Sequence, residues 1–241
     1  MPSQVLAVIP ARWGATRLPG KPLATLWGKP LLQHVWERAR GIRGVDALVI
    51  ATDDDRIERA ARDFGAVVER TSPDCASGSD RVAEVVRRRP ETAIVVNLQG
   101  DEPELDAEAV ARLVAGMRGD PSIRMATLVH READAAAMAS TNTAKVEVAP
   151  DGFALAFTRT DISREPGRGP VFRHVGVYGF RRDTLLEFTA WAPTPNEQAE
   201  RLEQLRALDH GVRIQVYESL VPSSGVDTSE QLAALEKRGP R

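Results

Sequence analysis

Short, almost wholly apolar runs alternate with amphipathic stretches in the first half of this chain. The runs cover residues 5–9 (VLAVI), 47–51 (ALVIA) and 93–98 (AIVVNL). Strands that helices cover on both faces have this continuous apolar character. The intervening periodicity predicts helices over residues 30–40, 54–64 and 80–89, with a short strand at 66–69. Strands that alternate with helices predict an open parallel sheet with right-handed crossovers.

The second half has a less regular pattern, in which strands follow one another directly. We expect strands over residues 125–129, 144–148, 153–158 and 171–180. The helical patterns cover residues 106–117, 183–191 and 197–210, with a terminal helix within 226–241. A segment rich in glycine and proline, residues 163–170 (SREPGRGP), predicts a loop. The chain therefore predicts one α/β domain whose second half carries an antiparallel elaboration.

The composition is typical of a folded domain without a membrane span. Of the 241 residues, 42% are hydrophobic and 27% are charged, a balance that argues against disorder. The formal net charge of −2 means that bulk electrostatics do not favour nucleic acid or anionic lipid. No apolar run approaches the roughly 18 residues of a membrane span, and the start lacks a basic leader.

Cysteine and histidine usage exclude two further classes of site. Cys75 is the only cysteine, so an intrachain disulfide and a multi-cysteine zinc site are both excluded, and we expect a reducing, cytoplasmic location. The four histidines are scattered without the spacing of metal ligands. The candidate chemistry is found instead at the ends of the predicted strands, where open parallel sheets bind their ligands.

The loop after the first predicted strand, residues 10–23 (PARWGATRLPGKPL), concentrates positive charge. It carries Arg12, Arg17 and Lys21 among glycines and prolines. Glycine lets backbone N–H groups approach an anion, and the cations neutralise its charge, so a triphosphate suits this loop. A solvated basic loop is the simpler explanation of the cations alone. The loop lacks GxxxxGK[ST] and GxGxxG, which excludes a P-loop and disfavours a dinucleotide fold.

Two further polar segments stand at predicted element ends. Asp101 and Glu102, in NLQGDEP directly after the most apolar strand, suit a hard divalent cation held together with phosphate. A polar turn is the simpler interpretation of these two residues alone. The segment SGSDR, residues 77–81, opens a helix whose N-terminus favours an anion or a base carbonyl. Ser77 or Ser79 also suits an ordinary N-cap there.

The second half places polar groups beside apolar runs. Arg159 follows a predicted strand, and His174 and Tyr178 share one face of their strand because even spacing keeps side chains on one face. Glu203 and Gln204 lie beside the apolar stripe of a predicted helix. A structural hydrogen bond is the usual explanation of any one such residue. The pattern by itself therefore leaves a structural and a binding role open.

Together, these segments resemble the 3-deoxy-manno-octulosonate cytidylyltransferases (CMP-Kdo synthetases), within the nucleotide-sugar pyrophosphorylase superfamily. The strongest matches are PAR…TRLPGKPL and NLQGDEP, and the others, in family order with them, are SGSDR, NTAKV, FRHVGVYGF, LEQLRAL and GVDT. The resemblance runs from about residue 5 to residue 235. It implies a Rossmann-like, mostly parallel sheet flanked by helices, as in nucleotide-diphospho-sugar transferases.

The resemblance also implies a division of labour within a single cytidylyltransferase domain. The expected parts are a nucleotide-binding part at about 1–130, a sugar-acid-binding and dimerisation part at about 131–225, and the C-terminal helix at 226–241. The implied reaction is Mg²⁺-dependent: CTP and 3-deoxy-D-manno-octulosonate (Kdo) give CMP-Kdo and diphosphate, for lipopolysaccharide or other surface glycans. The sugar C2 hydroxyl would attack the α-phosphorus in line, without a covalent enzyme intermediate. The family's members are typically homodimers.

The resemblance carries roles to individual positions of this chain. Asp101 and Asp227 are expected to hold Mg²⁺, and Arg12, Lys21 and Asp101 are expected to be catalytic. The nucleotide-binding positions are Ala11, Arg12, Lys21, Ser77, Gly78, Arg81, Gln99 and Asp101. The sugar acid is expected to contact Gln99, Arg159, His174, Tyr178, Glu203 and Gln204.

The sequence departs from the family pattern at four positions. Ala15 stands where serine is common, Cys75 where histidine is common, Ser79 where threonine is frequent, and Ser163 where proline is usual. Three alternatives remain open: the same chemistry on 8-amino-Kdo, Kdn or a sialic acid; the use of UTP or GTP; and a non-catalytic nucleotide-binding paralogue. The four charged residues expected to hold phosphate and metal argue against the last.

Overall fold

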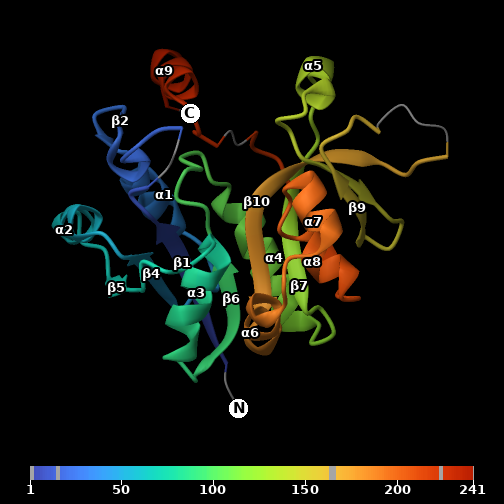
Figure 1. The fold of residues 1–241 in the computed structure, drawn as a ribbon, viewed down its shortest axis with the longest axis horizontal. Coiled ribbons are helices and arrows are strands. Elements are labelled where there is room, and N and C mark those ends of the chain that lie inside the picture. Colours follow the sequence, from blue (N-terminus) through green and yellow to red (C-terminus); the bar gives the residue numbers. More distant parts are fainter. Residues whose placement is uncertain (1–2, 15–16, 163–166, 223–224, 241) are drawn as a thin grey trace.

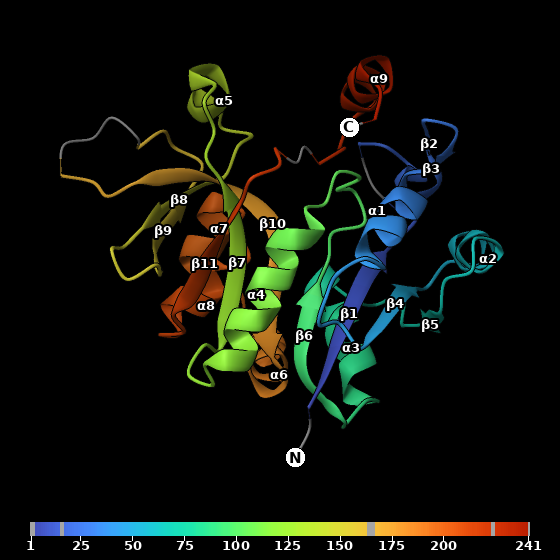
Figure 2. The same ribbon diagram turned by 180° about the vertical axis from the view of Figure 1, so that it is seen from behind.

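Strand β1 (Gln4–Ala11) lies between two parallel neighbours in a mixed sheet. The computed structural model describes residues 3–14, 17–162, 167–222 and 225–240. Within them, nine strands form this sheet in the order β11-β7-β10-β6-β1-β4-β5, with β8 paired to β10 and β9 paired to β8 (Figures 1 and 2). The other strands are β4 (Ala47–Thr52), β5 (Val68–Arg70), β6 (Thr92–Asn97), β7 (Met125–His130), β8 (Lys145–Val148), β9 (Ala154–Thr158), β10 (Val171–Arg181) and β11 (Ile214–Ser219).

Parallel pairing brings the carboxyl ends of the first-half strands to one edge of the sheet. β1 pairs in parallel with β4 and β6, and β4 pairs in parallel with β5. β10 runs antiparallel to β6 and β7, and β8 and β9 extend this antiparallel part. The expected sheet with an antiparallel elaboration is confirmed, although β11 pairs in parallel with β7. The loops after Ala11 and Asn97 therefore leave neighbouring strands at the same edge.

Alternate side chains of β1 enter two separate cores. Val5, Ala7 and Ile9 pack on one face and Leu6 and Val8 on the other, all fully buried. Helices line both faces, which explains why the strand is apolar throughout. The first core contains residues of α1 (Leu31–Ala39), α2 (Asp55–Asp63) and α4 (Ala107–Gly119) (Figure 2). The second contains residues of α3 (Gly78–Arg87), α6 (Arg182–Ala190) and α8 (Leu205–Asp209) (Figure 1).

The single helix predicted over residues 197–210 is wrong, because this segment forms two short helices. α7 (Pro195–Glu200) is followed by Arg201, whose φ of 54° is left-handed and interrupts the helical path. α8 begins only at Leu205, and Leu202 and Leu205 are both buried. The apolar spacing therefore predicts burial correctly, but it does not reveal the break.

Several short elements have no counterpart in the sequence prediction. Strand β11 escapes it because only its two end residues are buried, so it shows neither a continuous nor an alternating pattern. The remaining unpredicted elements are η1 (Lys21–Leu23), β2 (Thr25–Leu26), β3 (Lys29–Pro30) and α5 (Ala135–Ala139). The terminal helix α9 (Ser229–Arg238) is shorter than the predicted 226–241. Residues 163–166 of the predicted loop, and Ala15, lie outside the described residues.

The C-terminal segment returns to the start of the chain. Val226 and Leu235 pack with Leu26 and Leu31 in a small separate cluster. The backbone N–H of Val226 donates to the carbonyl of Asp101 at 2.9 Å. Residues distant in the sequence are thus brought together at the sheet edge. No helix within the described ranges is both long and apolar enough to cross a membrane.

Candidate active site

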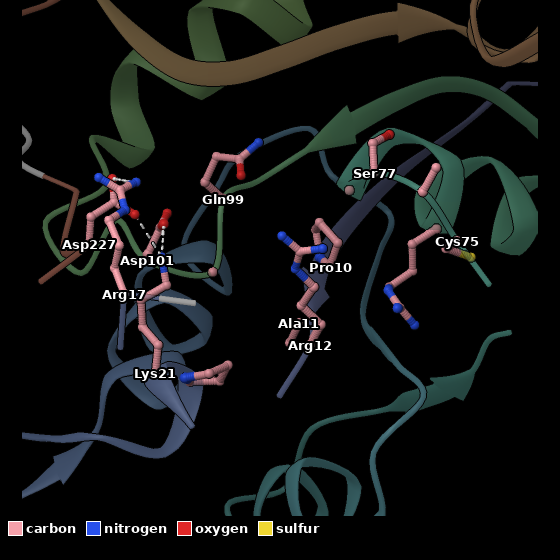
Figure 3. Close-up of a pocket in the computed structure, with 15 residues that line it drawn as sticks. Pro10, Ala11, Arg12, Arg17, Lys21, Cys75, Ser77, Gln99, Asp101 and Asp227 are labelled. Carbon is pink, nitrogen blue, oxygen red and sulfur yellow. Dashed lines mark hydrogen bonds and ion pairs between the residues drawn. The ribbon is translucent and has the colours of Figure 1, made fainter. Parts of the chain in front are cut away.

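A cavity of about 420 Å³ lies where the chain leaves β1 and β6 (Figure 3). Its walls come from the loop after β1, the start of α3, the loop after β6 and the segment before α9. All the sequence-predicted nucleotide positions line it: Ala11, Arg12, Lys21, Ser77, Gly78, Arg81, Gln99 and Asp101. In Figure 3 the charged cluster around Lys21 occupies one end of the cavity, and Ser77 and Cys75 the other.

The loop after β1 folds back on itself to present Lys21. Gly20 adopts a φ of 70°, and its N–H donates to the carbonyl of Trp13 at 3.1 Å. A Cβ at Gly20 would lie only 2.8 Å from the Trp13 ring, so glycine is required by both conformation and space. The 3₁₀ turn η1 starts at the next residue, Lys21, with Pro22 behind it. The glycines and prolines of the basic loop are therefore parts of a fixed turn.

Lys21 lies between two carboxylates. Its ammonium is 2.5 Å from Asp101 Oδ2 and 3.1 Å from Asp227 Oδ1. Burial acts to lower the pKa of Lys21, but the charges and hydrogen bonds of Asp101 and then Asp227 outweigh it and raise that pKa above its ordinary value. Arg17 pairs with the other oxygen of Asp227 at 3.0 Å. The site prediction omitted Arg17, although its position in the same basic loop is a usable signal.

The two aspartates fit a divalent cation that keeps other ligands. Within the described ranges, no three histidine, cysteine, aspartate or glutamate side chains gather into a metal-binding group. Asp101 and Asp227 nevertheless converge on a single cationic nitrogen. Mg²⁺ is usually bound by one or two carboxylates together with water and substrate phosphate. The pair therefore suits Mg²⁺ that enters with a phosphate ligand, and does not suit a closed, all-protein metal cage.

The N-terminus of α3 forms another wall of this cavity. Ser77 is the N-cap, its hydroxyl accepts from the N–H of Asp80 at 3.2 Å, and Asp80 accepts from the N–H of Ser77 at 2.9 Å. This capping box fixes the first turn of the helix, and Ser77 and Gly78 line the cavity. A Cβ at Gly78 would lie 3.4 Å from Pro10, so the start of α3 packs directly against the end of β1.

Arg81 and Cys75 line the cavity, but their functional groups are engaged elsewhere. The Arg81 guanidinium pairs with Asp53 at 2.9 Å and donates to the Thr71 hydroxyl. The Cys75 thiol donates to Glu84 at 3.4 Å, and burial raises the pKa of Cys75 to about 11. A thiol at neutral pH is a poor nucleophile. Both residues therefore shape the wall of the cavity.

A second cavity, of about 700 Å³, adjoins the first. The two share Gly78, Gln99, Asp101 and Asp227 among their lining residues. All the positions predicted for the sugar acid line the second cavity: Gln99, Arg159, His174, Tyr178, Glu203 and Gln204. Lining residues that the sequence prediction omitted include Ser79, Asn142, Arg173 and Arg201. The helical break at Arg201 is the local feature that turns the following residues, Glu203 and Gln204, into this cavity.

A chain of hydrogen-bonded polar groups reaches the second cavity, which Ser79 and Glu203 line. The Asn97 amide donates to the Ser79 hydroxyl at 3.3 Å, and that hydroxyl donates to Glu203 at 2.5 Å. Burial raises the pKa of Glu203, while hydrogen bonds from Ser79 and Ser77 oppose the rise. The Tyr178 hydroxyl donates to Gln204 Oε1 at 3.0 Å. Gln204 Nε2 has no hydrogen-bond partner among the described residues, so a donor is left for a ligand.

Arg159 and His174 are held at the wall by different means. The Arg159 Nε donates to the carbonyl of Glu200 at 3.0 Å. Lys145, a fully buried side chain, donates to the carbonyls of Ser140 and Arg159 at 2.6 Å each. Burial, and then the nearby charge of Arg159, lower the pKa of His174 to about 3. At neutral pH the wall therefore carries a cationic arginine and a neutral imidazole.

Comparisons with known proteins agree over nearly the whole chain. A sequence profile described as Cytidylyltransferase matches residues 6–214. The chain is 46% identical over 237 residues to 3-deoxy-manno-octulosonate cytidylyltransferase of Myxococcus xanthus, across 97% of this chain and 95% of that protein. It is 49% identical over 232 residues to the protein of the same name in Anaeromyxobacter sp. (strain K), across 95% and 94%. A solved structure of CMP:2-keto-3-deoxy-manno-octonic acid synthetase complexed with CTP matches with a TM-score of 0.91 and 41% identity, over 98% of both chains.

Proposed function

This chain belongs to the cytidylyltransferase family, and we propose that it transfers CMP from CTP to 3-deoxy-manno-octulosonate and releases diphosphate. The oxygen of the sugar C2 hydroxyl forms a bond to the α-phosphorus, the bond from that phosphorus to diphosphate breaks, and the hydroxyl proton is lost. Relatives with 46% and 49% identity carry the name of this activity. The product, CMP-Kdo, supplies the sugar acid for lipopolysaccharide or other surface glycans.

The observation that carries the proposal is the junction of the two cavities at Gln99, Asp101 and Asp227. A reaction between a nucleotide and a sugar acid needs the α-phosphorus and the attacking hydroxyl at one point, with each substrate in its own site. The cationic side chains at one end of the first cavity suit the phosphates of the nucleotide, and the second cavity suits the sugar acid. The two substrates then meet at the residues that line both cavities.

On the nucleotide side, Lys21 and Arg12 hold the phosphates. Both charges counter the negative charge that builds up on the departing diphosphate. Lys21 is well suited because its ammonium is largely buried and already surrounded by hydrogen-bond acceptors. Ala11, Ser77, Gly78 and Arg81 form the wall around the nucleoside, and Gln99 stands at the border with the sugar acid.

We propose Mg²⁺ as the cofactor, held by Asp101 and Asp227. When bound, Mg²⁺ supplies charge neutralisation at the phosphate oxygens and favours loss of the hydroxyl proton. The two aspartates position that charge at the border between the cavities. In the absence of ligand, the Lys21 ammonium occupies the carboxylates that would hold the metal. When the nucleotide binds, this ammonium exchanges the two carboxylates for phosphate oxygens.

On the sugar side, Arg159 supplies the positive charge that faces the carboxylate of the sugar acid. Glu203 and Gln204, together with His174 and Tyr178, supply hydrogen bonds to its hydroxyls. These contacts discriminate between sugar acids. An acid that lacks a hydroxyl at the matching position leaves a buried polar group of the protein without a hydrogen-bond partner, which weakens its binding.

The nucleotide part at about 1–130 and the sugar-acid part at about 131–225 remain our division of the domain. We propose a homodimer that pairs through the second half, where the apolar residues Leu155 and Leu220 are 56% and 75% exposed. Light scattering on the purified protein tests this oligomeric state.

We propose that the protein is located in the cytoplasm, since its single thiol, Cys75, needs no oxidising compartment.

A two-way substrate panel tests the function. Diphosphate release is measured with CTP, UTP, GTP and ATP at a fixed concentration of Kdo, and then with CTP against Kdo, 8-amino-Kdo, Kdn and a sialic acid. We expect the highest kcat/KM for CTP with Kdo. A higher kcat/KM for another acid would show that the chain carries out the same reaction on that acid. Nucleotide binding without turnover of any acid would favour the non-catalytic paralogue.

A further inference from the structure

Thr127, on β7, contacts the imidazole of His174 from inside the sheet. Its side chain is fully buried, and its Oγ1 lies 2.9 Å from His174 Nε2. The same Oγ1 donates to the carbonyl of Val177 at 2.8 Å. That carbonyl lies where the register between β10 and β7 shifts, between Val175 and Tyr178. An irregularity in the strand pairing therefore brings one hydroxyl between a carbonyl and an imidazole.

Counting protons determines the direction of these bonds. A carbonyl oxygen accepts only, and a threonine hydroxyl has a single proton to donate. The proton of Thr127 is used by Val177, so Thr127 must accept from His174. His174 Nε2 therefore carries the hydrogen. In a neutral imidazole the other nitrogen, Nδ1, then has a free lone pair and is a hydrogen-bond acceptor.

Other contacts keep the ring neutral and in place. Burial, with Arg159 nearby, lowers the pKa of His174 to about 3, so the ring is uncharged at neutral pH. Its centroid lies 5.4 Å from the rings of both Phe157 and Tyr178. Among the described residues, Nε2 is the ring nitrogen of His174 that makes a hydrogen bond, which it donates to Thr127. Since His174 lines the second cavity, Nδ1 is left to a ligand.

We propose that Thr127 is a positioning residue that holds His174 in the Nε2–H tautomer, so that Nδ1 accepts a hydrogen bond from a hydroxyl of the sugar acid. This inference rests on the proposed function and adds the chemical identity of the group that His174 meets. Because the lone pair of Nδ1 repels a carboxylate, the carboxylate of the substrate lies away from His174. A hydroxyl of the sugar acid faces Nδ1 instead and donates to it. Thr127 contributes without being among the residues that line the cavity.

Two substitutions at Thr127 separate this role from simple packing. Thr127→Val has nearly the same shape but no hydroxyl, and Thr127→Ser keeps the hydroxyl. In Thr127→Val we expect the KM for the sugar acid to rise about tenfold, the KM for CTP to change less than about twofold, and kcat to fall less than KM rises. Thr127→Ser should retain most of the parent affinity. Equal changes in both KM values, or parent kinetics in Thr127→Val, would overturn the proposal.

Nitrogen-15 NMR of histidine-labelled protein reads the tautomer directly. The His174 signals are assigned by their loss in His174→Gln, since the chain has four histidines. We expect a protonated Nε2 and an unprotonated Nδ1 in the parent and in Thr127→Ser, and a changed tautomer ratio in Thr127→Val. A proton on Nδ1 in the parent would refute the inference even if Thr127→Val fails to fold. Because this readout needs no turnover, it also separates failure of the inference from failure of the proposed function.

Discussion

The ammonium of Lys21 lies 2.5 Å from Asp101 Oδ2, although 80 positions separate the two residues in the chain. Lys21 follows the turn after β1, and Asp101 follows β6, which pairs in parallel with β1. Parallel neighbours end at the same edge of a sheet, so their loops meet there. This ion pair joins the cationic and acidic halves of the proposed phosphate site.

Asp101→Asn and Asp227→Asn should each lower kcat by roughly two orders of magnitude or more, because each removes a full charge from the proposed metal position. An amide preserves the shape, so we expect the melting temperature to change by only a few degrees. Diphosphate release and thermal unfolding measure the two effects. Asp151→Asn is the matched control, since Asp151 pairs with Arg213 at 2.5 Å on the exposed surface. Near-parent rates in both Asp101 and Asp227 variants would contradict the metal assignment.

Lys21→Met should separate binding of the metal from turnover. Without the ammonium, Asp101 and Asp227 lose their shared partner, so affinity for Mn²⁺ in the absence of nucleotide should rise at least about threefold. Turnover should fall about 100-fold, because the positive charge of Lys21 that stabilises the phosphates is lost. Calorimetric titration with Mn²⁺ and the diphosphate assay measure these changes. Lys29→Met is the control, because Lys29 pairs with Glu37 at 2.8 Å. Unchanged Mn²⁺ affinity would argue against competition between Lys21 and the metal.

Ser79→Ala should mainly weaken the binding of the sugar acid. It removes the donor that lies 2.5 Å from Glu203 and the acceptor used by Asn97. We expect the KM for the sugar acid to rise about tenfold with little change in the KM for CTP, and stability to fall by about 1–3 kcal/mol because buried groups lose partners. Initial rates and denaturant unfolding measure both. Ser79→Thr keeps the hydroxyl and should restore the KM. A rise in the KM for CTP alone would count against this assignment.

The lowered pKa of His174 predicts a loss of stability in acid. Its pKa is about 3 in the folded state against an ordinary value of 6.5. Between these values the unfolded chain binds the proton and the folded protein does not, so this group makes stability fall as pH drops from about 6.5 towards 3. In His174→Gln the melting temperature should depend less steeply on pH across this window than in the parent. The same change at the exposed His210 is the control, and identical slopes for parent and His174→Gln would contradict the prediction.

The strand and helix order of the first half could be predicted from the sequence because local pattern and tertiary environment agree there. β1, β4 and β6 are covered on both faces, so burial alone makes them continuously apolar. The pattern of β11 is weaker because only its ends, Ile214 and Ser219, are buried. Its place at the edge of the sheet beside β7 depends on neighbours that a local window does not contain.

The helix predicted over residues 197–210 shows why a periodic pattern can mislead. Leu202 and Leu205 are both buried, as the pattern predicts. Arg201, however, adopts a left-handed conformation, and Glu203 and Gln204 line a cavity. Polar side chains that line a cavity have the same sequence pattern as the solvent-exposed side of a helix. The two environments are distinguished only by what lies opposite them.

The order of the main elements, the basic loop and the resemblance that points to candidate residues can all be inferred from the amino-acid sequence alone. These follow from local propensities and from motifs that are contiguous in the chain. The tertiary fold, in contrast, brings Asp227 beside Asp101, gives the two cavities a shared border, and places Thr127 within hydrogen-bond distance of His174. Distances and hydrogen-bond directions between residues far apart depend on how strands pair and helices pack, and no local stretch of sequence encodes them alone.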